Sequence, residues 1–227
     1  MKTDTNAPPL NPLPWVVWAL ALPIIAMEAV LALRESGLTG AGAIGARLDA
    51  LQRFAVSPEL MRWMYENGVW PLDGLMRLVT YPFVQGSTTQ AVFVVVILLA
   101  LGKTVGEQFR WWAVLAVFFT SSVVAALGFC ALPFIQAPLY GGYPGNYGLI
   151  GAFTWLMWTR LQGTGSTQYR AFSMIGFLMG AQLLFALAFG TGPWWIAELI
   201  GFATGFALSF AVNPRGWALL MARLRQR

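Results

Sequence analysis

Histidine is absent from this chain of 227 residues, and cysteine occurs once, as Cys130. Zinc, haem and disulfide sites lose their usual ligands together, so we expect neither a metal nor a cofactor. A Ser-His or Cys-His nucleophile pair is excluded because no imidazole can act as the base. The two lysines, Lys2 and Lys103, lie in the N-terminal tail and at the end of an apolar segment. A Ser-Lys pair is therefore not supported either.

Charged residues are scarce as well, at 10% of the chain, whereas 58% of the residues are hydrophobic and the mean hydropathy is +0.64. This composition is typical of proteins that cross a membrane several times. The net charge of +5 is not gathered into a basic stripe, so we expect no nucleic-acid partner. The partner that the composition does predict is a lipid bilayer.

Six apolar segments are long enough to cross a hydrocarbon core of about 30 Å as helices. A long loop follows the first segment, and short joints that contain polar residues, glycine or proline separate the other five. The sequence therefore predicts an all-α integral membrane domain over residues 13–212, between tails at 1–12 and 213–227. The predicted spans are Leu13 to Leu33, Thr88 to Val105, Trp111 to Ala131, Pro144 to Leu161, Ala171 to Phe189 and Trp194 to Val212.

The orientation follows from the basic residues, because Lys and Arg beside short loops stay on the cytoplasmic side. Lys103 and Arg110 flank the joint after the second span, and Arg160 and Arg170 flank the joint after the fourth. The tail 213–227 is also basic, whereas the two short joints on the opposite side, 132–143 and 190–193, carry no charge, and the arginines of the long first loop are offset by acidic residues. We predict that both termini are cytoplasmic and that the protein lies in a bacterial inner membrane.

The first loop, residues 34–76, has a helical pattern of its own. Residues 46–55, ARLDALQRFA, predict a short amphipathic helix that lies at the membrane interface. A second helix is expected to begin at Ser57 and Pro58, with serine as the N-cap. The aromatic residues that follow suit an anchor at the level of the lipid headgroups. They are Trp63, Tyr65 and Trp70.

Two carboxylates lie within the predicted spans, Glu28 in the first and Glu198 in the sixth. An ionisable residue at membrane depth is a functional hypothesis by default, so a proton or substrate pathway is one interpretation. The sequence indicates no basic partner for either residue and nothing that brings them together. A transporter therefore has little support.

The stretch PLYGGYPGNYGLIGA, residues 138–152, is unusually rich in glycine for the start of an apolar helix. It resembles the active-site segment of the rhomboid intramembrane serine proteases, and the two align without a gap. The alignment puts Tyr143 at the position of the catalytic serine. It puts Pro144 in place of the glycine that follows the serine. The matching residues are Pro138, Leu139, Gly141, Gly148, Leu149, Gly151 and Ala152.

Two further segments resemble the same family. RLVTYPFVQGSTTQAVFVVVILLALGKTVGE, residues 77–107, is similar to the second-span block, whose oxyanion-stabilising histidine and asparagine fall on Gln90 and Val94. AELIGFATGF, residues 197–206, is similar to the sixth-span block, whose general-base histidine falls on Glu198. The resemblance covers about residues 77–209 and implies a rhomboid-like bundle of six transmembrane helices.

This chain has small residues at the positions where the resemblance implies a contact between the fourth and sixth spans. We expect Gly148 and Gly151 to face Gly201 and Gly205, because small residues let two helix backbones approach closely in a membrane. A hydrogen bond between Tyr143 and Glu198 is expected to replace the catalytic pair. No catalytic residue is therefore predicted.

The resemblance implies a non-catalytic member of the rhomboid family, a pseudoprotease that binds or escorts transmembrane helices of client membrane proteins. One alternative is an active rhomboid serine endopeptidase, which would need a serine at position 143 and a base at position 198. Another is a structural or assembly subunit of a bioenergetic membrane complex. The sequence does not predict the client or the oligomeric state.

Overall fold

A computed structural model describes residues 12–36, 45–161, 168–189 and 192–212. The predicted tails, apart from residue 12, lie outside the described residues. The described part is helical, with one isolated β-bridge in which the backbones of Val56 and Leu139 exchange two hydrogen bonds of 2.9 Å. This bridge ties the first loop to the segment that precedes residue 143.

The helices follow the predicted segments closely. The long helices are α1 (Trp15–Glu35), α5 (Thr88–Gly106), α6 (Trp111–Cys130), α7 (Tyr143–Leu161), α8 (Ser173–Phe189) and α9 (Trp194–Val212). The first loop holds α2 (Ala46–Phe54), α3 (Pro58–Asn67), α4 (Leu72–Thr80) and the 3₁₀ turn η2 (Tyr81–Phe83), and a second 3₁₀ turn, η3 (Gln168–Phe172), precedes α8.

Local sequence signals explain several helix ends. The predicted N-cap is confirmed, since the Ser57 hydroxyl accepts a hydrogen bond of 3.3 Å from the backbone N–H of Leu60. Ser87 caps α5 in the same way, through the N–H of Gln90 at 3.2 Å. Gly68 ends α3 in the left-handed region, with φ of 64°, which glycine adopts without steric cost.

Among the described residues, four helices are long and apolar enough to cross a membrane: α1, α5, α6 and α9. The fold is therefore that of an all-helical membrane protein, whereas the count of six spans stays a prediction. The helix α8 has 17 residues. The helix α7 has 19 residues but begins with YPGNYG, and most of its length is buried by other helices. A helix that is surrounded by protein does not need the apolar surface of one that faces lipid.

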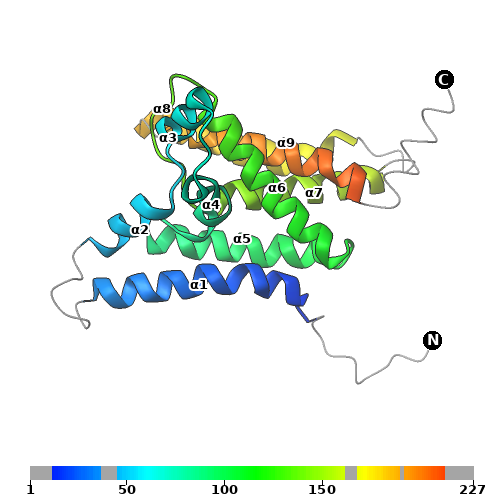
Figure 1. Cartoon of the computed structure of the whole chain (residues 1–227). Coiled ribbons are helices and arrows are strands. Elements are labelled where there is room, and N and C mark those ends of the chain that lie inside the picture. The colour runs from blue at the N-terminus through cyan, green and yellow to red at the C-terminus, as the bar shows by residue number, and fades with distance from the viewer. Residues whose placement is uncertain (1–11, 37–44, 162–167, 190–191, 213–227) are drawn as a thin grey trace, which may run out of the picture.

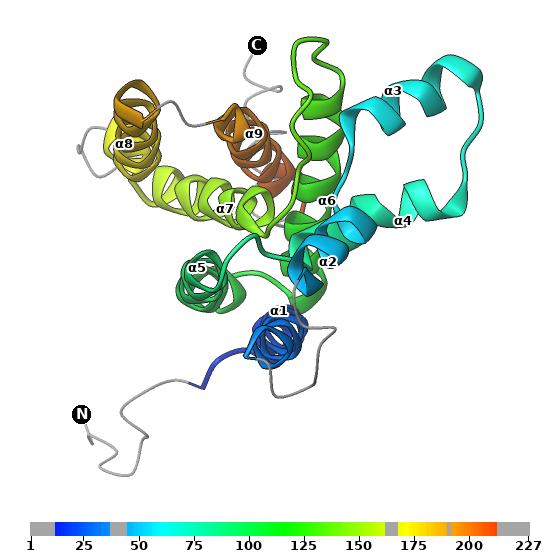
Figure 2. The same ribbon diagram turned by 90° about the vertical axis from the view of Figure 1, so that its left-hand side faces the viewer.

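The long helices pack around α7. Figure 1 shows α1 and α5 side by side, with α6 crossing above them towards α9, and Figure 2 shows these helices nearly end-on. The most extensive contacts of α7 are with α9, followed by those with α6 and α5. The largest buried cluster accordingly joins α1, α5, α6 and α7.

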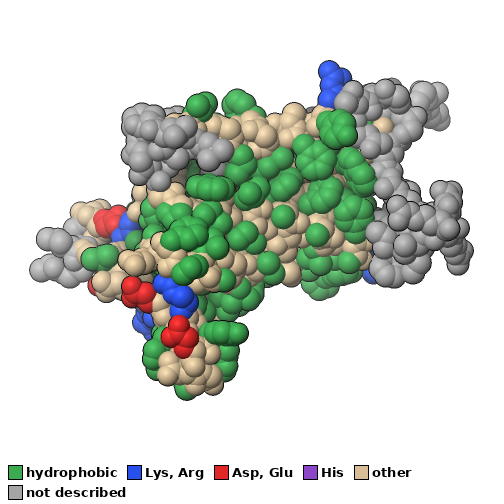
Figure 3. All heavy atoms as spheres, turned by 90° about the horizontal axis from the view of Figure 1, so that it is seen from above, with side chains coloured by type: hydrophobic (Ala, Val, Ile, Leu, Met, Phe, Trp, Pro, Cys, Tyr) green, Lys and Arg blue, Asp and Glu red, His purple; other side chains and the backbone are tan. Residues whose placement is uncertain are grey.

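The helices of the first loop lie to one side of the bundle, beside α1 and α6 (Figure 2). They are at the end where α1 and α6 finish and where α5, α7 and α9 begin (Figure 1). In Figure 3, hydrophobic side chains cover the middle of the visible face, and most coloured charges lie near its ends. This distribution suits a protein whose middle is in contact with lipid.

Candidate functional site

A small cavity lies where α7 and α9 begin. Its volume is about 240 Å³, and three of the four positions aligned with catalytic residues line it: Gln90, Tyr143 and Glu198. The remaining lining residues are Leu139, Tyr140, Pro144 and Trp194. The structure thus brings side chains from three long helices and the loop before α7 into one site.

Among the described residues that line this cavity, Glu198 carries the only carboxyl group, and it is 5% exposed. Its carboxyl group hydrogen-bonds with the hydroxyl of Tyr147 on α7. Tyr143 also lies close enough for electrostatic interaction with the carboxyl group. The sequence analysis missed Tyr147, although its spacing of four residues from Tyr143 places both phenols on one face of α7.

Two glutamines lie against the loop that precedes α7. Gln85 is buried; its amide donates to the carbonyl of Pro82 at 2.8 Å, and its oxygen accepts from the N–H of Gly142 at 3.3 Å. The side-chain oxygen of Gln90 accepts from the N–H of Gly86 at 3.0 Å. Gly141 lies against both glutamines with φ of 92°, so a side chain there would be strained and crowded.

Val94, the fourth aligned position, is fully buried beneath Gly142 and does not line the cavity. Its backbone carbonyl accepts a hydrogen bond of 2.8 Å from the side-chain amide of Asn146, which joins α5 to α7. An apolar side chain at this position offers no hydrogen bond to a developing oxyanion.

Glycines bring α7 and α9 into backbone contact. A Cβ atom at Gly201 would meet the carbonyl oxygen of Pro144, and one at Gly205 would meet the carbonyl oxygen of Gly148. The contact is reciprocal, since a Cβ atom at Gly151 on α7 would meet the backbone of Phe202 and Phe206 on α9. Any larger residue at these positions would therefore push the two backbones apart.

Gly148 has a further role beside its contact with Gly205. A Cβ atom added to Gly148 would point towards α6 and meet the side chain of Ser121. The glycine therefore lets α7 approach two helices at once, which agrees with its place at the centre of the bundle.

Glu28 does have a basic partner, which corrects the expectation drawn from the sequence. The guanidinium group of Arg47 on α2 donates two hydrogen bonds to its carboxylate, at 2.8 and 3.0 Å. The same guanidinium donates to Glu35, at 2.8 and 3.0 Å, and to the carbonyl of Gln85 at 3.0 Å. The hydrogen bonds with Glu28, followed by those with Glu35, raise the pKa of Arg47 above its ordinary value.

This arrangement defines an all-helical membrane protein with a small cavity, lined in part by three aromatic residues, at the start of two helices that contact each other through glycine. A family model described as the Rhomboid domain matches residues 73–215, which is more than half of the chain. The chain therefore belongs to the rhomboid family, as the resemblance over residues 77–209 indicated. No curated protein was found to match it.

Proposed function

We propose that this protein is a non-catalytic member of the rhomboid family that binds transmembrane helices of client membrane proteins. The observation that carries the proposal is the lining of the cavity at the start of α7. Tyr143 and Glu198 occupy the positions aligned with the serine and the histidine, and no Ser, Thr, Cys or Lys side chain lies among the described residues that line the cavity. Fold alone does not transfer an activity, so the chemistry of the site decides.

The pair that is present is poorly suited to nucleophilic catalysis. A phenol with an ordinary pKa near 10 is a weak nucleophile at neutral pH, and a carboxylate is a poor base for it. The backbone amides of Gly141 and Gly142 are already bonded, to the carbonyl of Tyr81 at 3.1 Å and to Gln85. They are therefore not free donors for an oxyanion.

Client binding is supported by two apolar faces on either side of α7. The helix α8 contacts the rest of the bundle near its start, through residues such as Ile175, while Phe177 and Leu184 are 76% and 70% exposed. On α5, Val92, Phe93 and Val96 are also exposed. A client helix that enters between α5 and α8 would meet both faces and reach the cavity at Tyr143.

The proposal includes the predicted orientation, with both termini in the cytoplasm of a bacterial cell and the cavity opening to the opposite side. The described chain supports this, because α1 begins and α9 ends at the same end of the bundle (Figure 1). Lys103 and Arg110 border the α5–α6 joint at that end as well.

A cleavage assay tests the proposal. The full chain is reconstituted in liposomes with single-span reporter proteins, and the products are separated by mass, with Tyr143→Phe and Glu198→Gln as matched variants. We expect no cleavage by any of the three proteins. Reproducible cleavage by the unmodified chain that either substitution abolishes would establish an active endopeptidase instead.

A further inference from the structure

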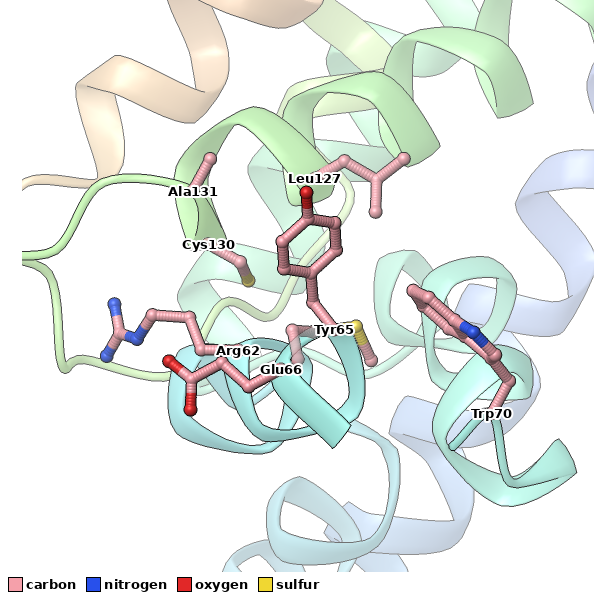
Figure 4. A pocket seen from close by; sticks show the side chains of 8 residues that line it. Arg62, Tyr65, Glu66, Trp70, Leu127, Cys130 and Ala131 are labelled. Carbon is pink, nitrogen blue, oxygen red and sulfur yellow. The ribbon is translucent and has the colours of Figure 1, made fainter. Parts of the chain in front are cut away.

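A second and larger cavity lies under α3, apart from the site at Tyr143. Its volume is about 490 Å³, within the range of about 300–1,000 Å³ that is usual for ligand pockets. None of its lining residues belongs to the first cavity. They come from α3, from the turn after it and from the end of α6: Met61, Arg62, Tyr65, Glu66, Trp70, Leu127, Cys130 and Ala131 (Figure 4).

The cavity lies at the end of α6, at the level where aromatic residues are exposed. Tyr65 is 78% exposed, and Trp63 and Trp70 are about half exposed. Aromatic side chains of this kind concentrate where lipid headgroups meet the hydrocarbon. Leu127, on the wall formed by α6, is also about half exposed, so the cavity opens beside an exposed apolar side chain of a membrane-length helix.

One edge of the cavity carries one positive and one negative charge. Arg62 and Glu66 are four residues apart on α3, and Figure 4 shows both side chains on the same edge. The guanidinium of Arg62 is fixed, because its Nη1 donates to the carbonyls of Leu132 and Ile135, both at 3.1 Å. Within the described part of the chain, its Nε and Nη2 donate no hydrogen bond and can bind another acceptor. No ion pair between Arg62 and Glu66 is found in the described part of the chain.

We propose that this cavity binds a zwitterionic phospholipid with a primary ammonium headgroup, of the phosphatidylethanolamine type. The phosphate accepts hydrogen bonds from Arg62, the ammonium donates to the carboxylate of Glu66, and an acyl chain lies against Leu127 and the rings of Tyr65 and Trp70. The carbonyl end of α3, which is the negative end of the helix dipole, is next to Glu66 and favours the ammonium further.

The two charges also select against other lipids. An anionic headgroup without an amine satisfies Arg62 but faces the carboxylate of Glu66 unfavourably. A quaternary ammonium headgroup has no N–H to donate to that carboxylate. The preference is therefore for the ethanolamine headgroup over both glycerol and choline headgroups.

Native mass spectrometry of the full chain tests the headgroup preference. The protein is placed in nanodiscs of equal amounts of phosphatidylethanolamine, phosphatidylcholine and phosphatidylglycerol, and the lipids that it retains are counted. Glu66→Gln should lower the preference for phosphatidylethanolamine over phosphatidylglycerol by about three- to fivefold, the range expected for a partly exposed ion pair. Glu59→Gln, on the first turn of α3 and outside the cavity, should leave the preference unchanged. An identical lipid distribution in the unmodified chain and Glu66→Gln would overturn the proposal.

The position of the lipid is tested separately. Phosphatidylethanolamine with a diazirine on one acyl chain is added to the unmodified protein, irradiated, and mapped by peptide mass spectrometry. We expect adducts concentrated in residues 61–70 and 127–131. Adducts that are spread evenly over the exposed spans would show only ordinary bilayer contact and would refute a dedicated site.

Discussion

Arg47 and Glu28 form a bidentate ion pair between α2 and α1, although they are 19 residues apart in the sequence. Each side chain is only 13% exposed. Thr88, at the start of α5, donates its hydroxyl to the same carboxylate at 2.6 Å. The carboxylate of Glu28 is therefore a structural link between three helices, which gives a simpler account of it than a proton pathway does.

Arg47→Ala is expected to destabilise the protein by about 2 kcal/mol, because it leaves the Glu28 carboxylate without its cation in a largely buried place. Arg53→Ala is the matched control, since Arg53 lies on the same helix and its guanidinium lies over the ring of Phe54. The free energy of unfolding in mixed micelles, measured by SDS titration, compares the two. Equal losses for both variants would contradict a linking role for Arg47.

Gly205→Ala should cost about 1–3 kcal/mol of stability, because the new methyl group collides with the carbonyl of Gly148 and neither backbone can yield easily. Gly180→Ala on α8 is the control, since nothing among the described atoms lies within 4 Å of the added carbon. Alanine is a better helix former than glycine, so the control should be neutral or gain up to about 1 kcal/mol. Thermal unfolding followed by circular dichroism measures both. A Gly205→Ala protein as stable as the control would refute the backbone contact of α7 with α9.

Tyr147→Phe removes a hydrogen bond to a buried carboxyl group and should cost about 1 kcal/mol. Tyr143→Phe, which keeps the ring and removes a hydroxyl from a half-buried position, should cost less than half as much. The same unfolding measurement ranks the two variants. The reverse order would mean that Tyr143, as the sequence analysis expected, provides the main bond to Glu198.

Much of the helical framework follows from local sequence patterns. The span predicted at Trp194 to Val212 is observed with the same bounds, and α5 and α6 each differ by one residue at the C-terminal end. The predicted start at Ala171 was early, since the chain forms a 3₁₀ turn to Phe172 before α8 begins. Apolar length defines where a helix can lie in a membrane, but the pitch of its first turn depends on local hydrogen bonds.

The contacts between segments that are distant in the sequence could not be predicted from such local patterns. No periodicity connects Arg47 to Glu28, because an ion pair between two helices depends on how the intervening chain folds back. The helix α4 was also missed, since its nine residues lack a capping side chain at the start. The proximity of Gln90, Tyr143 and Glu198 could be expected only from alignment with a known family, because such an alignment carries long-range information that a single pattern does not.

The central claim is that the cavity at Tyr143 receives client helices and leaves them intact. The most direct measurement places a photo-crosslinking amino acid at position 143 of the full chain in its native membrane and identifies every adduct by mass spectrometry. Our account predicts a discrete set of uncleaved proteins, each joined through a transmembrane segment. Adducts that are truncated within their spans, or adducts with lipid alone, would contradict it.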